Sequence, residues 1–178
     1  SLTQISIPST ITKLEKEIFK DCSSLTQILI PSNVTSIGEA AFCGCSSLTQ
    51  ISIPSTITKL EKEMFKDCSS LTQILIPSNV TSIGEAAFYG CSSLIQISIP
   101  NSVTLIEINT FYMCTSLKDI TIPSSITSYG KKSFYECSSL LQISISTSVK
   151  LIGDDAFRRC KSLTQIVFPS SLKSISNY

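Results

Sequence analysis

The chain has 178 residues, and 42% of them are apolar, which is typical of a folded globular chain and not of a disordered one. Its 14 basic and 13 acidic side chains leave a net charge of only +1, so neither nucleic acid nor an anionic membrane is an expected partner. There is no histidine, which removes the commonest general base and the commonest zinc ligand. Apolar runs extend over a few residues, far fewer than the roughly 20 that a membrane-spanning helix needs, so we expect no direct membrane insertion of this segment.

Cysteine recurs at intervals of 23 residues along the chain, and leucine, isoleucine and phenylalanine keep the same interval. A longer period lies on top of it, because residues 1–46 and 47–92 differ only at Ile18, which becomes Met64, and at Cys43, which becomes Tyr89. We therefore predict a single repeat array over residues 1–178, made of seven 23-residue units and a partial eighth, with residues 1–46 duplicated as 47–92. We also expect this array to be part of a longer one.

Each unit begins with an alternating apolar segment. Residues 3–7 and their equivalents have the period-two pattern of a short β-strand, with Ile5 and Ile7 facing inward. A proline follows this segment in most units and marks the end of the strand, and Ser146 is the one replacement. After a polar turn, residues 35–37 are predicted to form a second, shorter strand.

The last part of the unit is compatible with one helical turn, because "GEAAFCGC" at residues 38–45 has a suitable composition. The position of Gly38 is occupied by glutamate in other units, so a positive φ is not expected there. One unit buries too little apolar surface to offset the entropy cost of ordering it. Units must therefore stack, with parallel strands about 4.8 Å apart and equivalent side chains in contact through a continuous core.

The unit Leu-x-x-Ile-x-Ile-Pro-x-x-Val-x-x-Ile-Gly-x-x-Ala-Phe-x-x-Cys-x-Ser resembles the 23-residue leucine-rich repeat of the BspA-like, or treponemal, class over the entire chain. Segments such as "SLTQISIPS" are most similar in sequence to the large surface-antigen families of mucosal protozoan parasites. The resemblance implies a leucine-rich-repeat solenoid: a right-handed coil with a parallel sheet of about eight short strands on the concave face, and short strands or single helical turns on the convex side. Many members are described as surface or secreted antigens and adhesins that bind host matrix or cell-surface proteins, which implies a location at the cell surface or outside the cell.

The regular cysteines are predicted to be a buried apolar ladder in the core, because free cysteine is among the most buried residue types. A metal site is not expected, since Cys-x-x-Cys spacing and histidine are both missing from the sequence. Cys43 lies outside the series, and we expect it to be nearer the surface and the thiol most worth testing for reactivity. The ladder consists of Cys22, Cys45, Cys68, Cys91, Cys114, Cys137 and Cys160.

The outward positions of the first strand in each unit form the candidate binding surface. In a leucine-rich strand the residues beside the central apolar one face the concave side, where this chain presents a glutamine in nearly every unit. An uncharged amide ladder is suited to binding protein or carbohydrate, and is equally compatible with a neutral face that has no partner. Specificity is expected from the diverged later units. The candidate residues are Gln50, Gln73, Gln96, Lys118, Asp119, Thr121, Leu141 and Gln142.

Asn33 and Asn79 each begin an Asn-x-Ser/Thr pattern in a predicted turn, so both are candidates for glycosylation. Asparagine is also an ordinary turn residue, which is the alternative explanation. No catalytic residue is identified, because no histidine is present to activate one of the many serines, and we expect neither enzymatic activity nor a cofactor.

Two functional hypotheses follow. The first is a non-enzymatic protein-binding module of a surface or secreted protein, used in adhesion or in recognition of a host or partner protein. The second is a structural scaffold or assembly element with no specific ligand on the concave face. Neither end of the array shows a polar capping unit, since Ser1 opens directly on a strand and residues 171–178 stop within a repeat. End-to-end self-association through exposed strand edges is therefore also expected.

Overall fold

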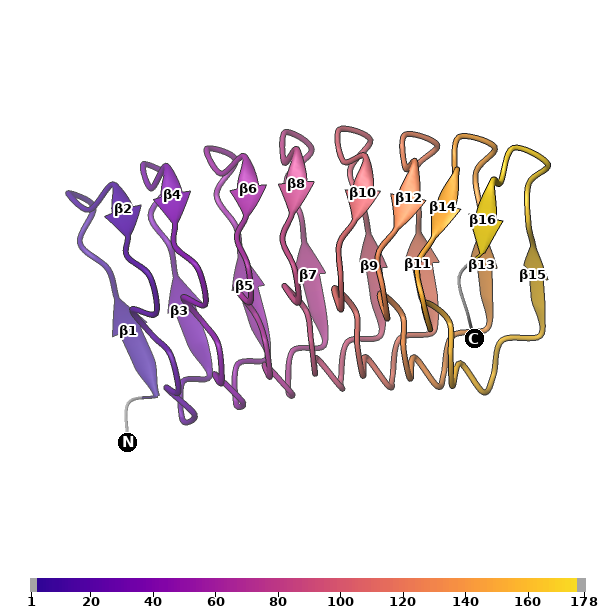
Figure 1. Ribbon diagram of the computed structural model, residues 1–178. Helices are drawn as coiled ribbons and strands as arrows, with labels where there is room; N and C mark the ends of the chain where they lie inside the picture. The colour runs from indigo at the N-terminus through magenta and orange to yellow at the C-terminus, as the bar shows by residue number, and fades with distance from the viewer. Residues whose placement is uncertain (1–2, 176–178) are drawn as a thin grey trace.

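The computed structural model describes residues 3–175 of the protein. The polypeptide winds into successive coils, and each coil contributes one three-residue and one two-residue strand (Figure 1). Parts of the two predicted uncapped ends lie outside the described residues, namely Ser1, Leu2 and residues 176–178. The predicted leucine-rich-repeat solenoid is confirmed.

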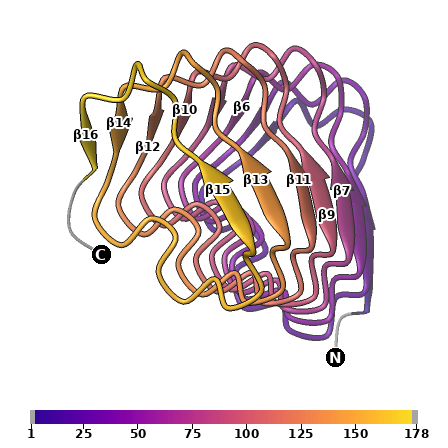
Figure 2. The same ribbon diagram turned by 90° about the vertical axis from the view of Figure 1, so that its right-hand side faces the viewer.

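The three-residue strands run side by side along the array, and viewed from its end they lie on a different side of the coil from the two-residue strands (Figure 2). Neighbouring strands are parallel, and within each of the three sheets that these strands form in the described residues a residue pairs with its equivalent 23 positions later, as Ile5 does with Ile28. The three-residue strands are β1 Gln4–Ser6, β3 Gln27–Leu29, β5 Gln50–Ser52, β7 Gln73–Leu75, β9 Gln96–Ser98, β11 Asp119–Thr121, β13 Gln142–Ser144 and β15 Gln165–Val167.

The predicted second strand is confirmed. It has two residues in each coil, where three were expected at residues 35–37. The two-residue strands are β2 Lys13–Leu14, β4 Ser36–Ile37, β6 Lys59–Leu60, β8 Ser82–Ile83, β10 Leu105–Ile106, β12 Ser128–Tyr129, β14 Leu151–Ile152 and β16 Ser174–Ile175. A proline-led turn joins the two kinds of strand, since the Val34 N–H donates to the Pro31 carbonyl at 3.1 Å. Ser146 keeps this turn, because its carbonyl accepts the Val149 N–H at 3.0 Å.

The alternative of a helical turn at residues 38–45 is wrong, and residues 3–175 contain no helix. The segment consists of consecutive turns, with the Cys43 N–H donating to the Ala40 carbonyl at 3.1 Å. Ala40 and Gly44 have positive φ angles of 51° and 74°, so the backbone leaves the right-handed helical region at both positions. Their N–H groups donate instead to the next coil, and that of Ala40 reaches the Lys62 carbonyl at 2.9 Å.

The core consists of rows of equivalent side chains that touch from coil to coil. The rings of Phe42 and Phe65 stack with centroids 5.6 Å apart and planes inclined by 3°. Leu25, Leu48 and Val34 are completely buried. Because every row continues through several coils, the interior is one uninterrupted hydrophobic core instead of a set of separate ones.

The two-residue strands are grouped in pairs in the first half of the array. Strand β2 pairs with β4 and β6 with β8, whereas no ladder joins β4 to β6 or β8 to β10 in the part of the chain that the structure describes. Figure 1 shows the wider separation at these two junctions. Beyond them, β10, β12, β14 and β16 form one continuous sheet.

Glycine directly after a two-residue strand coincides with this grouping as far as β14, whereas β16 pairs with β14 and is followed by serine in the sequence. The prediction that Gly38 needs no positive φ is confirmed, yet a Cβ atom there would lie 2.5 Å from the backbone nitrogen of Lys16 in the preceding coil. Glycine follows β4, β8, β12 and β14, each of which pairs with the two-residue strand before it. Glutamate occupies the same position after β6 and β10, at Glu61 and Glu107, and neither of these strands pairs with the two-residue strand before it in the described residues. A small cavity of about 120 Å³ lies at the junction of β4 and β6.

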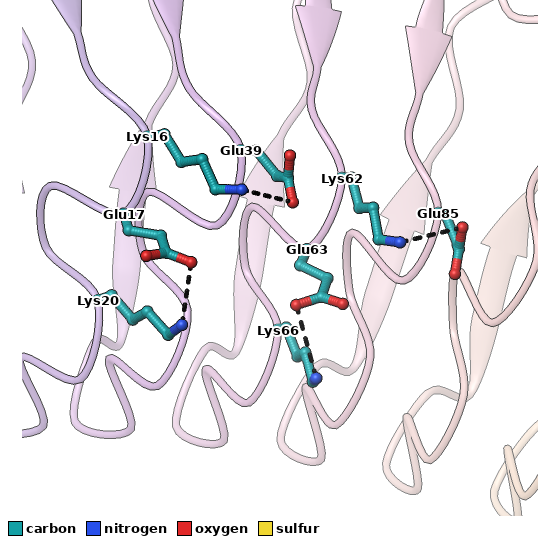
Figure 3. A network of polar contacts seen from close by, with 8 residues as sticks. All are labelled: Lys16, Glu17, Lys20, Glu39, Lys62, Glu63, Lys66 and Glu85. Carbon is teal, nitrogen blue, oxygen red and sulfur yellow. Dashed lines mark hydrogen bonds and ion pairs between the residues drawn. The ribbon is translucent and has the colours of Figure 1, made fainter.

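Ion pairs outside the core follow the same grouping of coils (Figure 3). Lys16 contacts Glu39 at 3.3 Å and Lys62 contacts Glu85 at 3.4 Å, each pair joining the two coils that a glycine brings together. These side chains are about half exposed, so each pair contributes at most about 1 kcal/mol to stability. In both copies of the duplicated block, the ion pair thus joins the same two coils that the two-residue strands join.

Candidate binding face

The outward side of the three-residue strands is here called the sheet face. Side chains alternate along each strand, so that in β5 Gln50 and Ser52 are exposed and Ile51 between them is buried. Parallel pairing in register brings equivalent residues of successive strands side by side, as it does for Gln50 and Gln73. The sheet face thus carries one row of glutamines and one row that begins with Ser6, on either side of the isoleucines.

A hollow of about 930 Å³ runs along the sheet face from β1 to β11. Five of the predicted binding residues line it: Gln50, Gln73, Gln96, Asp119 and Thr121. The other three, Lys118, Leu141 and Gln142, are exposed but lie outside the hollow. The arrangement therefore places the amide row and the start of the diverged units in one continuous concavity.

The glutamine side chains have no hydrogen-bond partner within residues 3–175, so their amides are available to a ligand. The neighbouring threonines are already engaged, since Thr26 Oγ1 donates to the Thr3 carbonyl at 3.0 Å and Thr72 Oγ1 to the Thr49 carbonyl at 3.3 Å. Asp119 is the one ionisable side chain among the residues that line the hollow. The hollow is thus neutral and rich in hydrogen-bonding amides over most of its length.

Two leucines at outward strand positions that are not among the predicted binding residues dominate the apolar part of the hollow. Leu29 is 75% exposed and Leu75 is 81% exposed, the highest values among the exposed large hydrophobic side chains. They alternate with Ser6, Ser52 and Ser98 in one row. The signal was present in the 46-residue repeat, which places leucine at this strand position in both copies of the duplicated block.

The regular cysteines lie inside the coils and are hydrogen-bonded as well as buried. Five of the seven are completely buried, and Cys22 and Cys160 near the two ends are half-buried. Each thiol from Cys45 onward donates to the carbonyl of a phenylalanine 26 residues earlier, as Cys91 Sγ does to Phe65 at 3.1 Å. Burial raises the pKa of Cys45 to about 12. These thiols serve the core and are poorly suited to nucleophilic chemistry.

Cys43 was expected to lie nearer the surface than the regular cysteines, and it is slightly more exposed than the five fully buried ones, yet it is still buried. Its reactivity stays a prediction. Its side chain is only 7% exposed, and burial raises its pKa. Residues at this position lie against their equivalents in the adjoining coils, as the rings of Tyr89 and Tyr112 do at 4.7 Å. Lys20 and Lys66 occupy the equivalent positions in the two adjoining coils, and their charges only partly offset the effect of burial on the pKa of Cys43.

The sequon asparagines have a structural role in the turns. Asn33 Nδ2 donates to the carbonyls of Ser9 and Ile11 at 2.7 and 3.0 Å, and Asn79 Nδ2 makes the equivalent two bonds at 2.7 and 3.2 Å. A hydroxyl takes over in the intervening coil, where Thr56 Oγ1 donates to the preceding coil. A sugar on Nδ2 would replace one of the two donated hydrogens. Glycosylation of both asparagines stays a prediction.

Among residues 3–175, no group of three or more histidine, cysteine, aspartate or glutamate side chains is arranged to hold a metal ion. None of the eight cysteines takes part in a disulfide there. In the same range, no helix has the length and apolar character needed to cross a membrane.

The sequence matches the family model described as "BspA type Leucine rich repeat region (6 copies)" over residues 1–92 and 61–178. No curated protein matches the chain.

Solved structures of bacterial proteins have the same fold. A leucine-rich repeat protein from Bacteroides ovatus is 33% identical with a TM-score of 0.92, over 96% of this chain and 47% of that one. A leucine rich cell surface protein from Faecalibacterium prausnitzii is 31% identical with a TM-score of 0.84, over 98% and 47%. The leucine-rich repeat protein of T. pallidum is 28% identical with a TM-score of 0.80, over 90% and 77%. The chain thus spans about half the length of the first two relatives.

Proposed function

We propose that this chain, which belongs to the BspA-type leucine-rich-repeat family, is a non-enzymatic protein-binding module that recognises a partner protein through its sheet face. The partner is a host matrix or cell-surface protein, and the module belongs to a surface or secreted protein with a role in adhesion. The diverged strands from β11 onward, with Lys118, Asp119 and Leu141, supply specificity at one end of the face.

The observation that carries this proposal is the continuous hollow along β1 to β11, with unengaged amides on one side and exposed leucines on the other. Leucine-rich-repeat solenoids use extended surfaces of this kind for binding. An exposed Leu29 or Leu75 side chain is unfavourable in water. Burying it fully against a partner stabilises the complex by about 1.5–3 kcal/mol. The glutamines supply hydrogen bonds that orient the partner.

A surface location is supported by the relative from F. prausnitzii, which is named as a leucine rich cell surface protein. Since this chain spans 47% of that protein, the location of the whole protein belongs to the proposal.

The test is binding of the purified chain to a panel of purified matrix and cell-surface proteins, measured by biolayer interferometry. The sheet-face variant carries Gln50→Ala, Gln73→Ala and Leu75→Ala, and the matched control carries Lys16→Ala and Lys62→Ala, which lie outside the sheet face. We expect saturable binding to at least one panel member, weakened about tenfold or more only by the sheet-face variant.

A second variant, with Lys118→Ala, Asp119→Ala and Leu141→Ala, tests the diverged strands. We expect it to change which panel members are bound, with little effect on overall stability. No saturable binding, or equal binding by the sheet-face variant and the control, would overturn the proposal. A change of oligomer size in light scattering with the same variants would favour the scaffold hypothesis instead.

A further inference from the structure

The row of the sheet face that begins with Ser6 alternates between small and large side chains. From β1 to β7 it reads Ser6, Leu29, Ser52 and Leu75, and it continues with Ser98 in β9. All of these residues line the hollow. Because Leu29 and Leu75 are 75% and 81% exposed, they stand above the serines as ridges, and each serine between ridges lies at the floor of a notch.

The spacing of the notches follows from the strand spacing. Parallel strands lie about 4.8 Å apart, so notches over alternate strands are about 9.6 Å apart. Ser52 pairs with Leu75 and lies one coil after Leu29, whereas Ser98 pairs with Thr121 and lies one coil after Leu75, so the second notch has a leucine ridge on one side and Thr121 on the other. A ligand that fills both notches must therefore present apolar groups at about this interval along its length.

A polyproline II segment has the required interval. It rises about 3.1 Å per residue with three residues per turn, which places every third side chain on one face at about 9.3 Å. An extended β-strand repeats on one face at about 6.6–6.8 Å and would fall out of step with the notches after one repeat. Residues seven apart on an α-helix are about 10.5 Å apart, but a helix has no free backbone groups for the glutamines to bond.

The glutamine row fits a polyproline II backbone as well. Such a segment has no internal hydrogen bonds, so its carbonyls project outward and need donors. Gln50, Gln73 and Gln96 lie in adjacent strands beside the notches, and their amides have no partner in the described part of the chain. Charge agrees with this partner, because the lining of the hollow has no ionisable side chain before Asp119 and offers no counter-ion to a charged ligand.

Resting on the proposed binding function of the sheet face, we propose that its ligand is an uncharged, proline-rich segment in the polyproline II conformation with an apolar residue at every third position. The segment lies across β3 to β9, its apolar side chains enter the notches over Ser52 and Ser98, and its carbonyls accept from the glutamine amides.

The test uses synthetic peptides and the isotope-labelled chain. The peptide (Leu-Pro-Pro)4 has leucine at every third position, and the control (Leu-Pro)6 has the same length with leucine at every second. Binding is followed by amide chemical shifts, which report weak affinity and locate the site. We expect saturable shifts at Ser52, Leu75 and Ser98, with a Kd about tenfold or more lower for the first peptide than for the control.

The decisive variant is Ser52→Leu, which fills one notch. It is expected to fold normally, because leucine already occupies the equivalent positions 29 and 75. The matched variant Ser144→Leu makes the same change in β13, outside the hollow. We expect Ser52→Leu to raise the Kd about tenfold or more and Ser144→Leu to leave it unchanged.

Equal affinity for the two peptides, or equal effects of the two variants, would overturn the inference. Concentration-dependent dimerisation that Ser52→Leu alters would do so too, because the ridges would then be packing against a second copy of the chain. If the protein panel is bound through the sheet face while (Leu-Pro-Pro)4 is not, the inference fails and the binding function stands; if neither is bound, both fail.

Discussion

Gly84 lies so close to Lys62 in the preceding coil that a Cβ atom on the glycine would be 2.6 Å from the Lys62 backbone nitrogen. The contact is accompanied by a backbone hydrogen bond of 2.8 Å from the Gly84 N–H to the Leu60 carbonyl. Together they join the third and fourth coils into one packed pair. Glycine is required here by space and not by its φ angle.

Gly84→Ala is therefore expected to lower the free energy of unfolding by about 1–3 kcal/mol, because an added methyl group must push two backbones apart. Urea unfolding measures the loss. Glu61→Ala is the control, since this equivalent position already holds a Cβ atom, and we expect a change within about 0.5 kcal/mol. Similar losses for both variants would contradict the role assigned to the glycine.

Glu61→Gly should have the opposite structural effect at the junction of β4 and β6. Without the Cβ atom the two coils can approach as their neighbours do, and the backbone groups of Ser36 and Lys59 can enter a ladder. Hydrogen exchange of the backbone amides at positions 59 and 61 is expected to slow relative to the Glu61→Ala variant. Unchanged exchange at both amides would show that another contact keeps these coils apart.

The stability of the protein should fall as pH rises from about 9 to about 12. Burial raises the pKa of Cys45 from an ordinary 9.0 to about 12, so in this range the unfolded thiol has lost its proton while the folded thiol retains it. The unfolded state then binds fewer protons, and the free energy of unfolding decreases with pH. Cys45→Ser keeps a donor for the Phe19 carbonyl, which Cys45 Sγ contacts at 3.1 Å, but does not titrate.

Urea midpoints measured at several pH values therefore test the effect. The wild type is expected to lose stability more steeply than Cys45→Ser above pH 9, since every other ionisable group is the same in both proteins. Parallel pH profiles for the two would mean that Cys45 is not protected from solvent.

Met113→Gly is expected to stabilise the fold by up to about 1 kcal/mol. Met113 has a φ of 59° and its side chain is 38% exposed, and equivalent positions hold Gly44 and Gly90 with φ angles of 74° and 70°. A non-glycine residue in the left-handed region carries a strain of about 1–2 kcal/mol, which outweighs the extra chain entropy of glycine. Thermal unfolding measures the gain, with Met113→Ala as the control that shortens the side chain but keeps the strain. A gain with alanine equal to that with glycine would rule out backbone strain as the cause.

Tyr129→Phe should also stabilise the protein, by about 1 kcal/mol or more, because a buried hydroxyl without a hydrogen bond is costly. Tyr129 is completely buried, and its hydroxyl is one of two side-chain oxygens, with that of Ser133, that lack a partner among the described residues. The ring packs against Phe134 and Phe157, with centroids at 6.0 and 5.7 Å, and phenylalanine preserves these contacts. Calorimetry compares Tyr129→Phe with Tyr129→Ile. The second variant introduces the isoleucine that several other coils have at the equivalent position, but it leaves a cavity. A lower midpoint for Tyr129→Phe than for the wild type would show that the hydroxyl is bonded in solution.

The sequence by itself determined the stacked architecture, the strands and the rows of the core. The physical reason is repetition: when every unit has the same length, equivalent residues must meet, and so the contact between Phe42 and Phe65 follows from their spacing alone. The sequence also places Gln50, Gln73 and Gln96 in one exposed row, because side chains alternate along a strand.

Only the tertiary structure decided which neighbouring coil each backbone group and side chain meets. It bends the segment after Gly38 into turns instead of a helix, because Ala40 donates its N–H to the next coil. It covers Cys43, whose neighbours along the array are 23 residues away, and it engages Asn33 with two carbonyls of the preceding coil. These features depend on the direction of bonds between coils, and a pattern read along one chain contains the period of the array but not those directions.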